Sequence, residues 1–269
     1  MSKVAGAVPP IRLIIIGDEI LSGRRQDKHL SSLIKLLSER GLGLHSAEII
    51  SDHPADIVAT LKRSFSTDDI VFCCGGIGAT PDDQTRQAAA AALGVPLVLH
   101  PEAAALITER CADNERAGQG SADMSLPENQ QRLQMGVFPE GAEIVPNSFN
   151  KIPGFFIQNH TFTPGFPVMA WPMMEWTLDH RYAHFQHREH RVEHSFLVFT
   201  MPESRITPAL EELEQRWPAV KAFSLPSVGE RGGRPHIELG VKGEAEACAQ
   251  AIHFLREEVL RLGGELSAV

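Results

Sequence analysis

The chain has 269 residues, of which 43% are hydrophobic and 22% charged, and its formal net charge is -9 at pH 7. This balance is ordinary for a globular protein, and the length suits one large domain or somewhat more. The negative charge argues against a nucleic-acid partner, which usually requires a basic surface, but it is compatible with a phosphate bound by backbone N–H groups.

Apolar strands alternate with amphipathic helices in the first half of the chain. Ile11–Ile16 is a β-branched apolar run typical of a buried strand, and further strands are predicted over 44–50 and 70–74. The helices predicted between and after these strands contain Leu30 to Leu37, begin at Pro54, and span 82–93. Strands that are apolar throughout and alternate with helices indicate an α/β fold: a doubly wound, mostly parallel sheet with helices on both faces.

The pattern changes near residue 190. After it, a β-α-β-β-α order is expected, which is typical of a small α+β domain. The predicted strands cover 194–201, 220–225 and 236–241, and the predicted helices cover 203–216 and 244–262. We therefore expect two domains, an α/β domain over 1–189 and a small α+β domain over 190–269.

The strongest chemical signal is the sequence CGGIGATPDD at 74–83, between a predicted strand and a predicted helix. Glycines let a backbone approach a ligand closely, and the start of a helix offers unpaired N–H groups and a positive dipole end. A phosphate fits both features. The residues predicted to bind it are Gly75, Gly76, Gly78 and Thr80.

Asp82 and Asp83 in the same sequence have two possible roles. They can cap the helix that follows, or they can hold a divalent cation, a ligand hydroxyl or an amine. The run is neither the GxGxxG fingerprint of a dinucleotide site nor a P-loop with its lysine. By itself it indicates an anion near a helix start.

Three other loops carry candidate residues. Acidic residues directly after the first strand of an α/β sheet often face the ligand crevice, so Gly17, Asp18 and Glu19 are predicted to bind a ligand or a metal. The alternative for them is a surface turn. Asn147 lies in a Pro- and Asn-rich loop, and the turn Pro164-Gly165 precedes a predicted helix and is a second possible anion site. Ordinary turn chemistry is the alternative for both loops.

Histidines recur before the predicted domain boundary, at spacings that would place several on one helical face. Pairs separated by four residues on a helix can bind zinc, whereas flanking arginines and glutamates are more typical of a solvated linker helix with a pH-sensitive surface. Both interpretations stay open. The residues are His180, His184, His187, His190 and His194.

The four cysteines, Cys73, Cys74, Cys111 and Cys248, have no zinc spacing, and free cysteines suit a reducing compartment. The N-terminus lacks a secretion signal, and the apolar run Ile11–Ile16 is too short to span a bilayer. We expect a cytoplasmic protein without a membrane association.

Several motifs together resemble the molybdopterin-binding domain of molybdenum-cofactor biosynthesis proteins, in particular the N-terminal part of competence/damage-inducible protein A. The resemblance covers roughly residues 11–180, and the smaller C-terminal part is similar to the KH-like module of the same group. The chain ends before the deamidase domain of longer members, so deamidase activity is not expected. The motifs lie at Gly17–Gly23, Gly75–Thr85, Pro139–Ala142, Asn147, Pro153–Gly154 and Pro164–Pro167.

The resemblance implies that the ligand is molybdopterin or a related pterin or nucleotide, and it adds Gly154 to the predicted ligand-binding residues. Related proteins are also implicated in hydrolysing the pyrophosphate of ADP-ribose or FAD with a divalent metal. A nucleotide pyrophosphatase that releases AMP is therefore the alternative, with Asp82 and Asp83 as catalytic candidates and Asp83 as a ligand for Mg²⁺ or another divalent ion. A homo-oligomer, either a dimer or a trimer, is also expected.

Departures from the family pattern keep a third interpretation open, namely a binding protein with a degenerate site. Ala79 replaces the proline of the family loop, Lys151 stands where a small residue is usual, and His29 replaces a side-chain amide.

Overall fold

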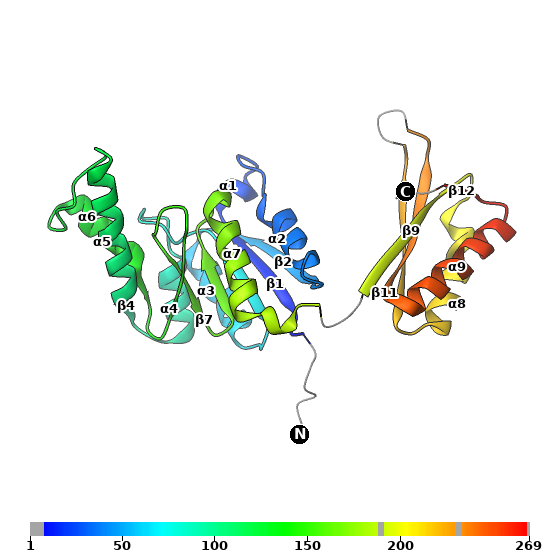
Figure 1. Cartoon of the computed structure of the whole chain (residues 1–269), viewed down its shortest axis with the longest axis horizontal. Coiled ribbons are helices and arrows are strands. Elements are labelled where there is room, and N and C mark those ends of the chain that lie inside the picture. Colours follow the sequence, from blue (N-terminus) through cyan, green and yellow to red (C-terminus); the bar gives the residue numbers. More distant parts are fainter. Residues whose placement is uncertain (1–7, 188–190, 230–232, 268–269) are drawn as a thin grey trace, which may run out of the picture. The chain divides into compact units, whose positions relative to one another are not determined.

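The computed structural model describes residues 8–187, 191–229 and 233–267. The chain divides between Gln186 and His187 into two compact units, each with its own sheet (Figure 1). Within the described residues, no helix combines the length and apolarity needed to cross a bilayer.

The first unit is built on a six-stranded sheet with the order β2-β1-β3-β8-β7-β6. β1 runs parallel to both β2 and β3, and β3 runs parallel to β8. β7 is antiparallel to both of its neighbours. The mostly parallel sheet confirms the predicted α/β class. In sheet order the strands are β2 (Leu44–Ile50), β1 (Ile11–Ile16), β3 (Ile70–Cys74), β8 (His160–Thr163), β7 (Gly154–Ile157) and β6 (Glu143–Val145).

Helices cover the two faces of this sheet and enclose two hydrophobic cores (Figure 1). The helices on one face are α2 (His29–Ser38) and α7 (Pro167–Arg181), and those on the other are α3 (Pro54–Phe65) and α4 (Thr85–Leu93). Alternate residues of β1 serve the two cores, with Ile15 in the first and Ile14 in the second. β1 is apolar at every position except Arg12, because both of its faces are covered, and its sequence was therefore recognisable as a buried strand.

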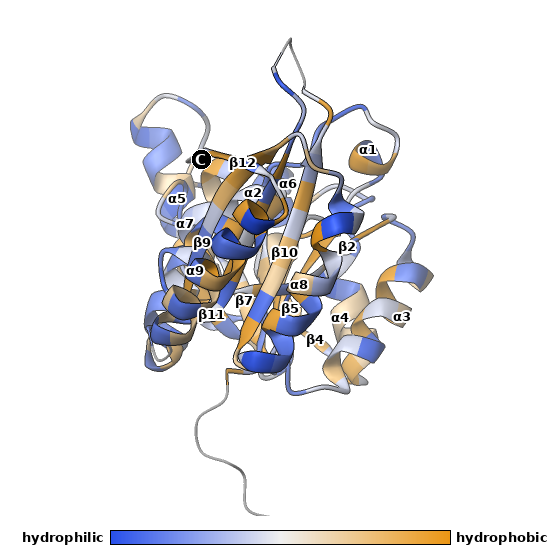
Figure 2. Ribbon diagram, turned by 90° about the vertical axis from the view of Figure 1, so that its right-hand side faces the viewer, coloured by the Kyte–Doolittle hydropathy of each residue, from blue (hydrophilic) through white to orange (hydrophobic). Residues whose placement is uncertain are grey.

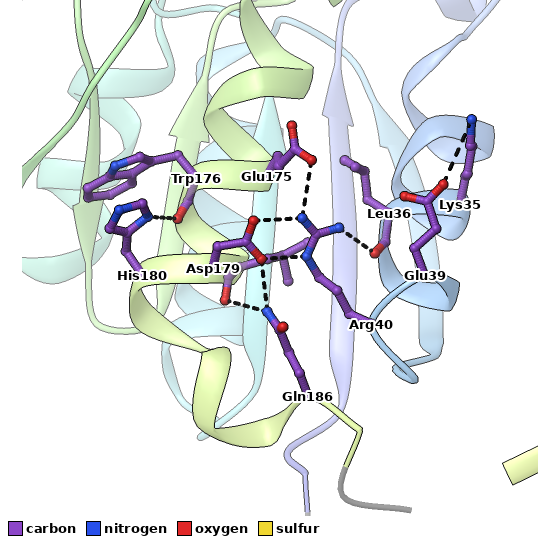
Figure 3. A network of polar contacts seen from close by, with 10 residues as sticks. Lys35, Leu36, Glu39, Arg40, Glu175, Trp176, Asp179, His180 and Gln186 are labelled. Atoms are coloured by element: carbon purple, nitrogen blue, oxygen red, sulfur yellow. Dashed lines mark hydrogen bonds and ion pairs between the residues drawn. The ribbon is translucent and has the colours of Figure 1, made fainter. Parts of the chain in front are cut away.

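An ion-pair network joins the two helices on the first face (Figure 3). Arg40, just after α2, is 9% exposed and donates to both carboxylate oxygens of Asp179 on α7, at 2.6 and 2.7 Å. It also donates to Glu175 at 3.2 Å and to the carbonyl of Leu36 at 2.9 Å. The planar guanidinium thus fixes the end of α2 against α7.

Between α4 and β6 the chain leaves the main sheet. β4 (Leu97–Leu99) pairs antiparallel with β5 (Val137–Pro139), and between them lie α5 (Pro101–Arg116), α6 (Pro127–Leu133) and a 3₁₀ turn, Gln134–Gly136. α5 and α6 lie side by side at the edge of the unit (Figure 1). The long helix α5 was not among the predicted elements, although Pro101 at its first position is a helix-start signal.

The second unit has a four-stranded antiparallel sheet with the order β10-β11-β9-β12 and two helices. Phe196, Leu239 and Leu255 are fully buried in its core. The ribbon colours of the helices alternate between hydrophobic and hydrophilic residues, as expected of helices packed on a sheet (Figure 2). The predicted β-α-β-β-α order is confirmed, and β12 is an additional edge strand. The elements are β9 (Arg191–Phe199), α8 (Glu203–Arg216), β10 (Val220–Ser227), β11 (His236–Glu244), α9 (Ala245–Arg261) and β12 (Glu265–Ser267).

The predicted histidine helix is wrong. α7 ends at Arg181, a separate 3₁₀ turn follows at Ala183–Phe185, and His194 already belongs to β9. The C-cap residue Tyr182 leaves helical geometry with φ -118° and packs in the first core, where it is 5% exposed. His180, still on α7, stacks on the ring of Trp176 of the same helix (Figure 3). His190 lies outside the described residues.

Candidate functional site

The loops that follow β1, β3 and β8 meet at the carboxyl edge of the sheet. β1 and β3 are neighbours, yet the next long helices after them, α2 and α4, pack on opposite faces. This is a topological switch point, where α/β proteins form their ligand crevice. The sequence-predicted segments 17–19, 75–83 and 164–165 therefore come together.

Two glycines make this meeting possible. Gly75 has φ +106°, and a Cβ there would lie 2.2 Å from the carbonyl oxygen of Ile16 at the end of β1. Gly76 has φ +68°, and its Cβ would lie 2.2 Å from Thr85 Oγ1, which itself donates to the carbonyl of Gly75 at 2.9 Å. A side chain at either position would displace backbone or the start of α4. A Cβ on Gly165 would contact the Cα of Gly75 at 3.5 Å, so the third loop is adjacent too.

Asp83 closes the Gly-rich loop rather than capping the helix. Its Oδ2 accepts from the backbone N–H of Thr80 at 2.9 Å and from Thr80 Oγ1 at 2.5 Å. α4 begins at Thr85, later than predicted, and its N-cap residue Gln84 makes no side-chain capping bond. The helix-cap interpretation of Asp82 and Asp83 is therefore wrong, because the chain makes a tight turn before the helix starts.

The Gly-rich loop has unused backbone donors. The N–H groups of Gly76, Ile77, Gly78 and Ala79 donate no hydrogen bond within the part of the chain that the structure describes. They precede the uncapped start of α4. Backbone N–H groups normally find an acceptor, so a run of unused donors beside a helix start suits an anion.

Carboxylates gather beside the loop after β1. Asp18 and Asp52, which follow β1 and β2, exchange hydrogen bonds: the N–H of Asp18 donates to Asp52 Oδ2 at 3.1 Å, and the N–H of Asp52 donates to Asp18 Oδ1 at 3.3 Å. Burial raises the pKa of Asp52; the N–H of Asp18 opposes this shift, while the negative charges of Asp18, Glu19 and Asp82 add to it. Asp52 was missed, although it follows a strand just as Asp18 does.

These carboxylates do not form a ready metal site. Among the residues that the structure describes, no three His, Cys, Asp or Glu side chains are grouped so as to hold a metal ion. Asp83 as a metal ligand therefore stays a prediction. The arrangement gives this side of the loop a concentrated negative charge.

His29 connects two of the loops. It is 5% exposed, and its Nε2 lies 3.1 Å from the carbonyl oxygen of Gly165, to which it can donate. Asp27 accepts from the N–H groups of His29 and Leu30 at 2.8 and 3.0 Å, which fixes the start of α2. The imidazole that departs from the family pattern thus positions the Pro164-Gly165 turn.

Asn147 and Gly154 lie in and after the loop that joins β6 to β7. Asn147 is 5% exposed, and its Nδ2 donates to Asn150 Oδ1 and the carbonyl of Ile152, at 2.8 and 2.9 Å. A Cβ on Gly154 would lie 2.2 Å from the carbonyl oxygen of Phe162. Gly154 begins β7, and the loop with Asn147 joins β6 to it, so both lie at the edge of the sheet where β8 and β3 end, with β8 between β7 and β3. Their role in ligand binding stays a prediction.

Lys151 pairs with acidic side chains of α5. Its Nζ lies 2.5 Å from Glu109 and 2.6 Å from Asp113, and these partners raise its pKa, Asp113 most. The cation that departs from the family pattern is thus compensated by two carboxylates of α5.

A cavity of about 250 Å³ lies on the side of the loop that faces α6 and β4. Arg86 of α4 lines it, is 5% exposed, and donates through Nη2 to the carbonyl of Gly78 at 2.5 Å. Gln131 of α6 donates to the carbonyl of Ala79 at 2.7 Å. Both were missed. Arg86 directly follows the Gly-rich motif and could have been found, whereas nothing in the sequence links Gln131 to this loop. The lining residues are Ala79, Thr80, Pro81, Gln84, Arg86, Gln87, Leu97, Gln131, Gln134 and Val137.

Comparison with known proteins agrees with this geometry. Residues 12–184 match the family described as "Probable molybdopterin binding domain", so the chain belongs to that family. The match covers the first unit and its three converging loops.

Relatives extend the similarity to the second unit. A CinA-like protein of Anaeromyxobacter dehalogenans is 31% identical over 264 residues, which cover 95% of this chain and 60% of the relative. A protein of Aeropyrum pernix is 29% identical over 270 residues, covering 96% of this chain and 97% of its own. This chain thus spans about 60% of the length of the CinA-like relatives that it matches.

Among solved structures, the protein CinA of Thermoplasma acidophilum, described as of unknown function, superimposes with a TM-score of 0.53 at 23% identity. The similarity covers 64% of this chain and 97% of that one. It supports the fold.

Proposed function

We propose that this protein binds a phosphate-bearing ligand, a pterin or a nucleotide pyrophosphate, at the Gly-rich loop 75–83. The observation that carries the proposal is the run of unused N–H donors from Gly76 to Ala79, next to the start of α4, whose N-cap residue Gln84 makes no side-chain capping bond. Phosphate oxygens accept hydrogen bonds from such donors and are favoured by the helix dipole. Membership of a molybdopterin-binding family favours a pterin-type ligand.

Binding can be tested by calorimetry with molybdopterin and with ADP-ribose, each titrated into the full chain. We expect saturable binding of at least one of them and its loss in Gly78→Val, because a side chain at Gly78 would press on Asp83, whose Oδ2 lies 2.5 Å from the Cβ position. Gly43→Val is the matched control, since Gly43, like Gly78, has no positive φ and a Cβ there meets nothing within 4 Å. Binding of neither ligand, or equal binding by Gly78→Val, would contradict the proposal.

A second candidate function is metal-dependent hydrolysis of a nucleotide pyrophosphate to release AMP. It is favoured by the carboxylates that raise the pKa of Asp52, because a divalent cation would offset their mutual repulsion. Asp18, Glu19 and Asp82 are the side chains that would hold it. Such an ion polarises a phosphoryl group and lowers the pKa of a bound water.

The two functions are separated by assaying AMP release from ADP-ribose and from FAD with Mg²⁺. For the hydrolase we expect turnover that Asp82→Asn abolishes and that Asp68→Asn, an exposed aspartate outside these loops, leaves unchanged. Ligand binding without AMP release would support only the binding function, which includes a binding protein with a degenerate site. The homo-oligomer, the cytoplasmic location and the KH-like nature of the second unit stay predictions.

A further inference from the structure

The cavity beside the Gly-rich loop contains a buried cation without a matching anion. Arg86 is 5% exposed, and its Nε has no hydrogen-bond partner among the described residues. The hydrogen bond that Arg86 makes goes to a neutral carbonyl, that of Gly78. Burial lowers the pKa of Arg86, opposed only by the charge of Asp83. A buried guanidinium with an unused donor is costly unless an anion accompanies it.

The other lining groups suit an anion. No acidic side chain lines the cavity in the described part of the chain, and its polar lining consists mainly of glutamines and Thr80. Two of these glutamines, Gln84 and Gln131, already donate to the carbonyls of Pro81 and Ala79 and so hold the wall of the cavity in place. The lining therefore supplies no carboxylate to pair with Arg86, and Asp83 is the acidic group that acts on it from outside the lining.

The negative charge gathered near Asp52 supports this assignment. Asp18, Glu19 and Asp82 act on Asp52 there, so a phosphate among these carboxylates would meet a negative field unless a cation intervened. Beside Arg86 a phosphate meets a buried positive charge, with Asp83 as the acidic neighbour. The two places thus differ in the sign of the charge they accept.

We propose that the cavity is an anion subsite in which the Arg86 guanidinium binds a phosphate group. Arginine suits this role because its planar donors match two phosphate oxygens at once. The volume of about 250 Å³ accommodates a phosphate together with part of the molecule that carries it. The phosphate can be free or belong to a nucleotide, and only the second case rests on the function proposed above.

The test uses the full chain with three probes at constant ionic strength: inorganic phosphate, AMP and adenosine. We expect phosphate and AMP to bind in calorimetry and adenosine, which lacks the anion, to bind at least tenfold more weakly than AMP. If AMP displaces inorganic phosphate one for one, the subsite binds the phosphate group of the nucleotide. If AMP leaves the binding of inorganic phosphate unaffected, the subsite binds free phosphate.

Two variants address the cavity itself. Arg86→Gln removes the cation but also a bond to Gly78, so it can disturb the loop. Gln87→Glu is the milder change, because Gln87 is exposed on α4, lines the cavity and would place a negative charge in it. Both should weaken phosphate binding at least tenfold. Gln215→Glu, an exposed position on α8 in the second unit, is the control and should bind phosphate as the original chain does.

The failure of this subsite and that of the proposed function are distinguishable. If ADP-ribose binds equally to the original chain and to Gln87→Glu, and phosphate binds to neither, the subsite is overturned while the proposed function stands. If phosphate binding depends on Arg86 and Gln87 but ADP-ribose and molybdopterin do not bind, the subsite stands and the proposed function fails.

Discussion

Ser64 on α3 and His160 at the start of β8 share a buried hydrogen bond, with 2.6 Å between Oγ and Nε2. The other ring nitrogen, Nδ1, lies 2.7 Å from the carbonyl of Gln158, which fixes it as the donor, so Nε2 accepts from the serine. His160 is fully buried, and burial lowers its pKa from 6.5 to about 4. The imidazole is therefore neutral in the folded protein at pH 7.

This burial predicts a pH dependence of stability. Because the folded pKa of His160 is below the unfolded one, its contribution is full above pH 6.5 and is lost as the pH falls towards 4. The loss should reach about 3 kcal/mol, since one pKa unit corresponds to about 1.4 kcal/mol. Urea unfolding between pH 7.5 and 4 would measure it.

The contribution of His160 is isolated by comparing, between variants, the slope of the free energy of unfolding against pH. His160→Phe should lower stability at pH 7 but flatten the loss between pH 6.5 and 4, whereas the exposed His253→Gln should keep the original slope. A slope in His160→Phe equal to that of the original chain would contradict the assignment.

The Arg40–Asp179 pair should contribute more than an exposed pair on the same helix. Arg40 is nearly buried and binds both oxygens of Asp179, whereas Lys35 and Glu39 are exposed and 3.8 Å apart (Figure 3). A double-mutant cycle with Arg40→Met and Asp179→Asn should give a coupling of about 1 kcal/mol, discounted for the partial exposure of Asp179. The cycle with Lys35→Met and Glu39→Gln should give less than about 0.5 kcal/mol. Equal couplings would show that burial of Arg40 has no effect.

Gly75 should tolerate no side chain. Gly75→Ala is expected to destabilise the chain by about 3 kcal/mol, because its φ is strained for alanine and its Cβ would overlap the carbonyl oxygen of Ile16. Gly118→Ala has a similarly positive φ but open space, and should cost only about 1 kcal/mol. Chemical unfolding of both variants measures the difference. A Gly75→Ala cost no larger than that of Gly118→Ala would mean that the approach to β1 is looser than described.

Asp52→Asn should stabilise the free protein at neutral pH. A carboxyl whose pKa is raised in the folded state costs stability above that pKa and none when it is protonated. The gain should be at most about 1 kcal/mol at pH 7 and should vanish near pH 3. Asp68→Asn, for which the same charges are absent from its surroundings, is the comparison in thermal unfolding. A loss of stability in Asp52→Asn at pH 7 would show that its ionised form is favoured.

The sequence predicted the parts of the site that depend on local pattern. β1 and β3 are buried strands, β3 apolar throughout and β1 apolar except at Arg12, and Gly75 and Gly76 stand where the backbone needs positive φ. The short turn before α4 was missed because Asp83 bonds to Thr80, a choice that propensity does not reveal.

Other parts depend on contacts between distant segments. Arg86 is buried because α6 and β5 cover it, and these elements lie beyond a helix that was not predicted. His29 matters because it meets Gly165, 136 positions later. The prediction for the histidine row was wrong because the backbone leaves helical geometry at Tyr182, where periodicity would continue α7.

The pairing of β3 with β8 has a consequence for synthesis of the chain. Thr163 lies 89 positions after its neighbour Cys74. During translation, the apolar strand β3 therefore emerges with the edge that pairs with β8 still unpaired, until almost the whole first unit has left the ribosome. β1 pairs with the other edge of β3 and so leaves this edge open throughout that interval. Growth conditions that slow elongation between α4 and β8 should therefore favour aggregation of the nascent chain over its folding.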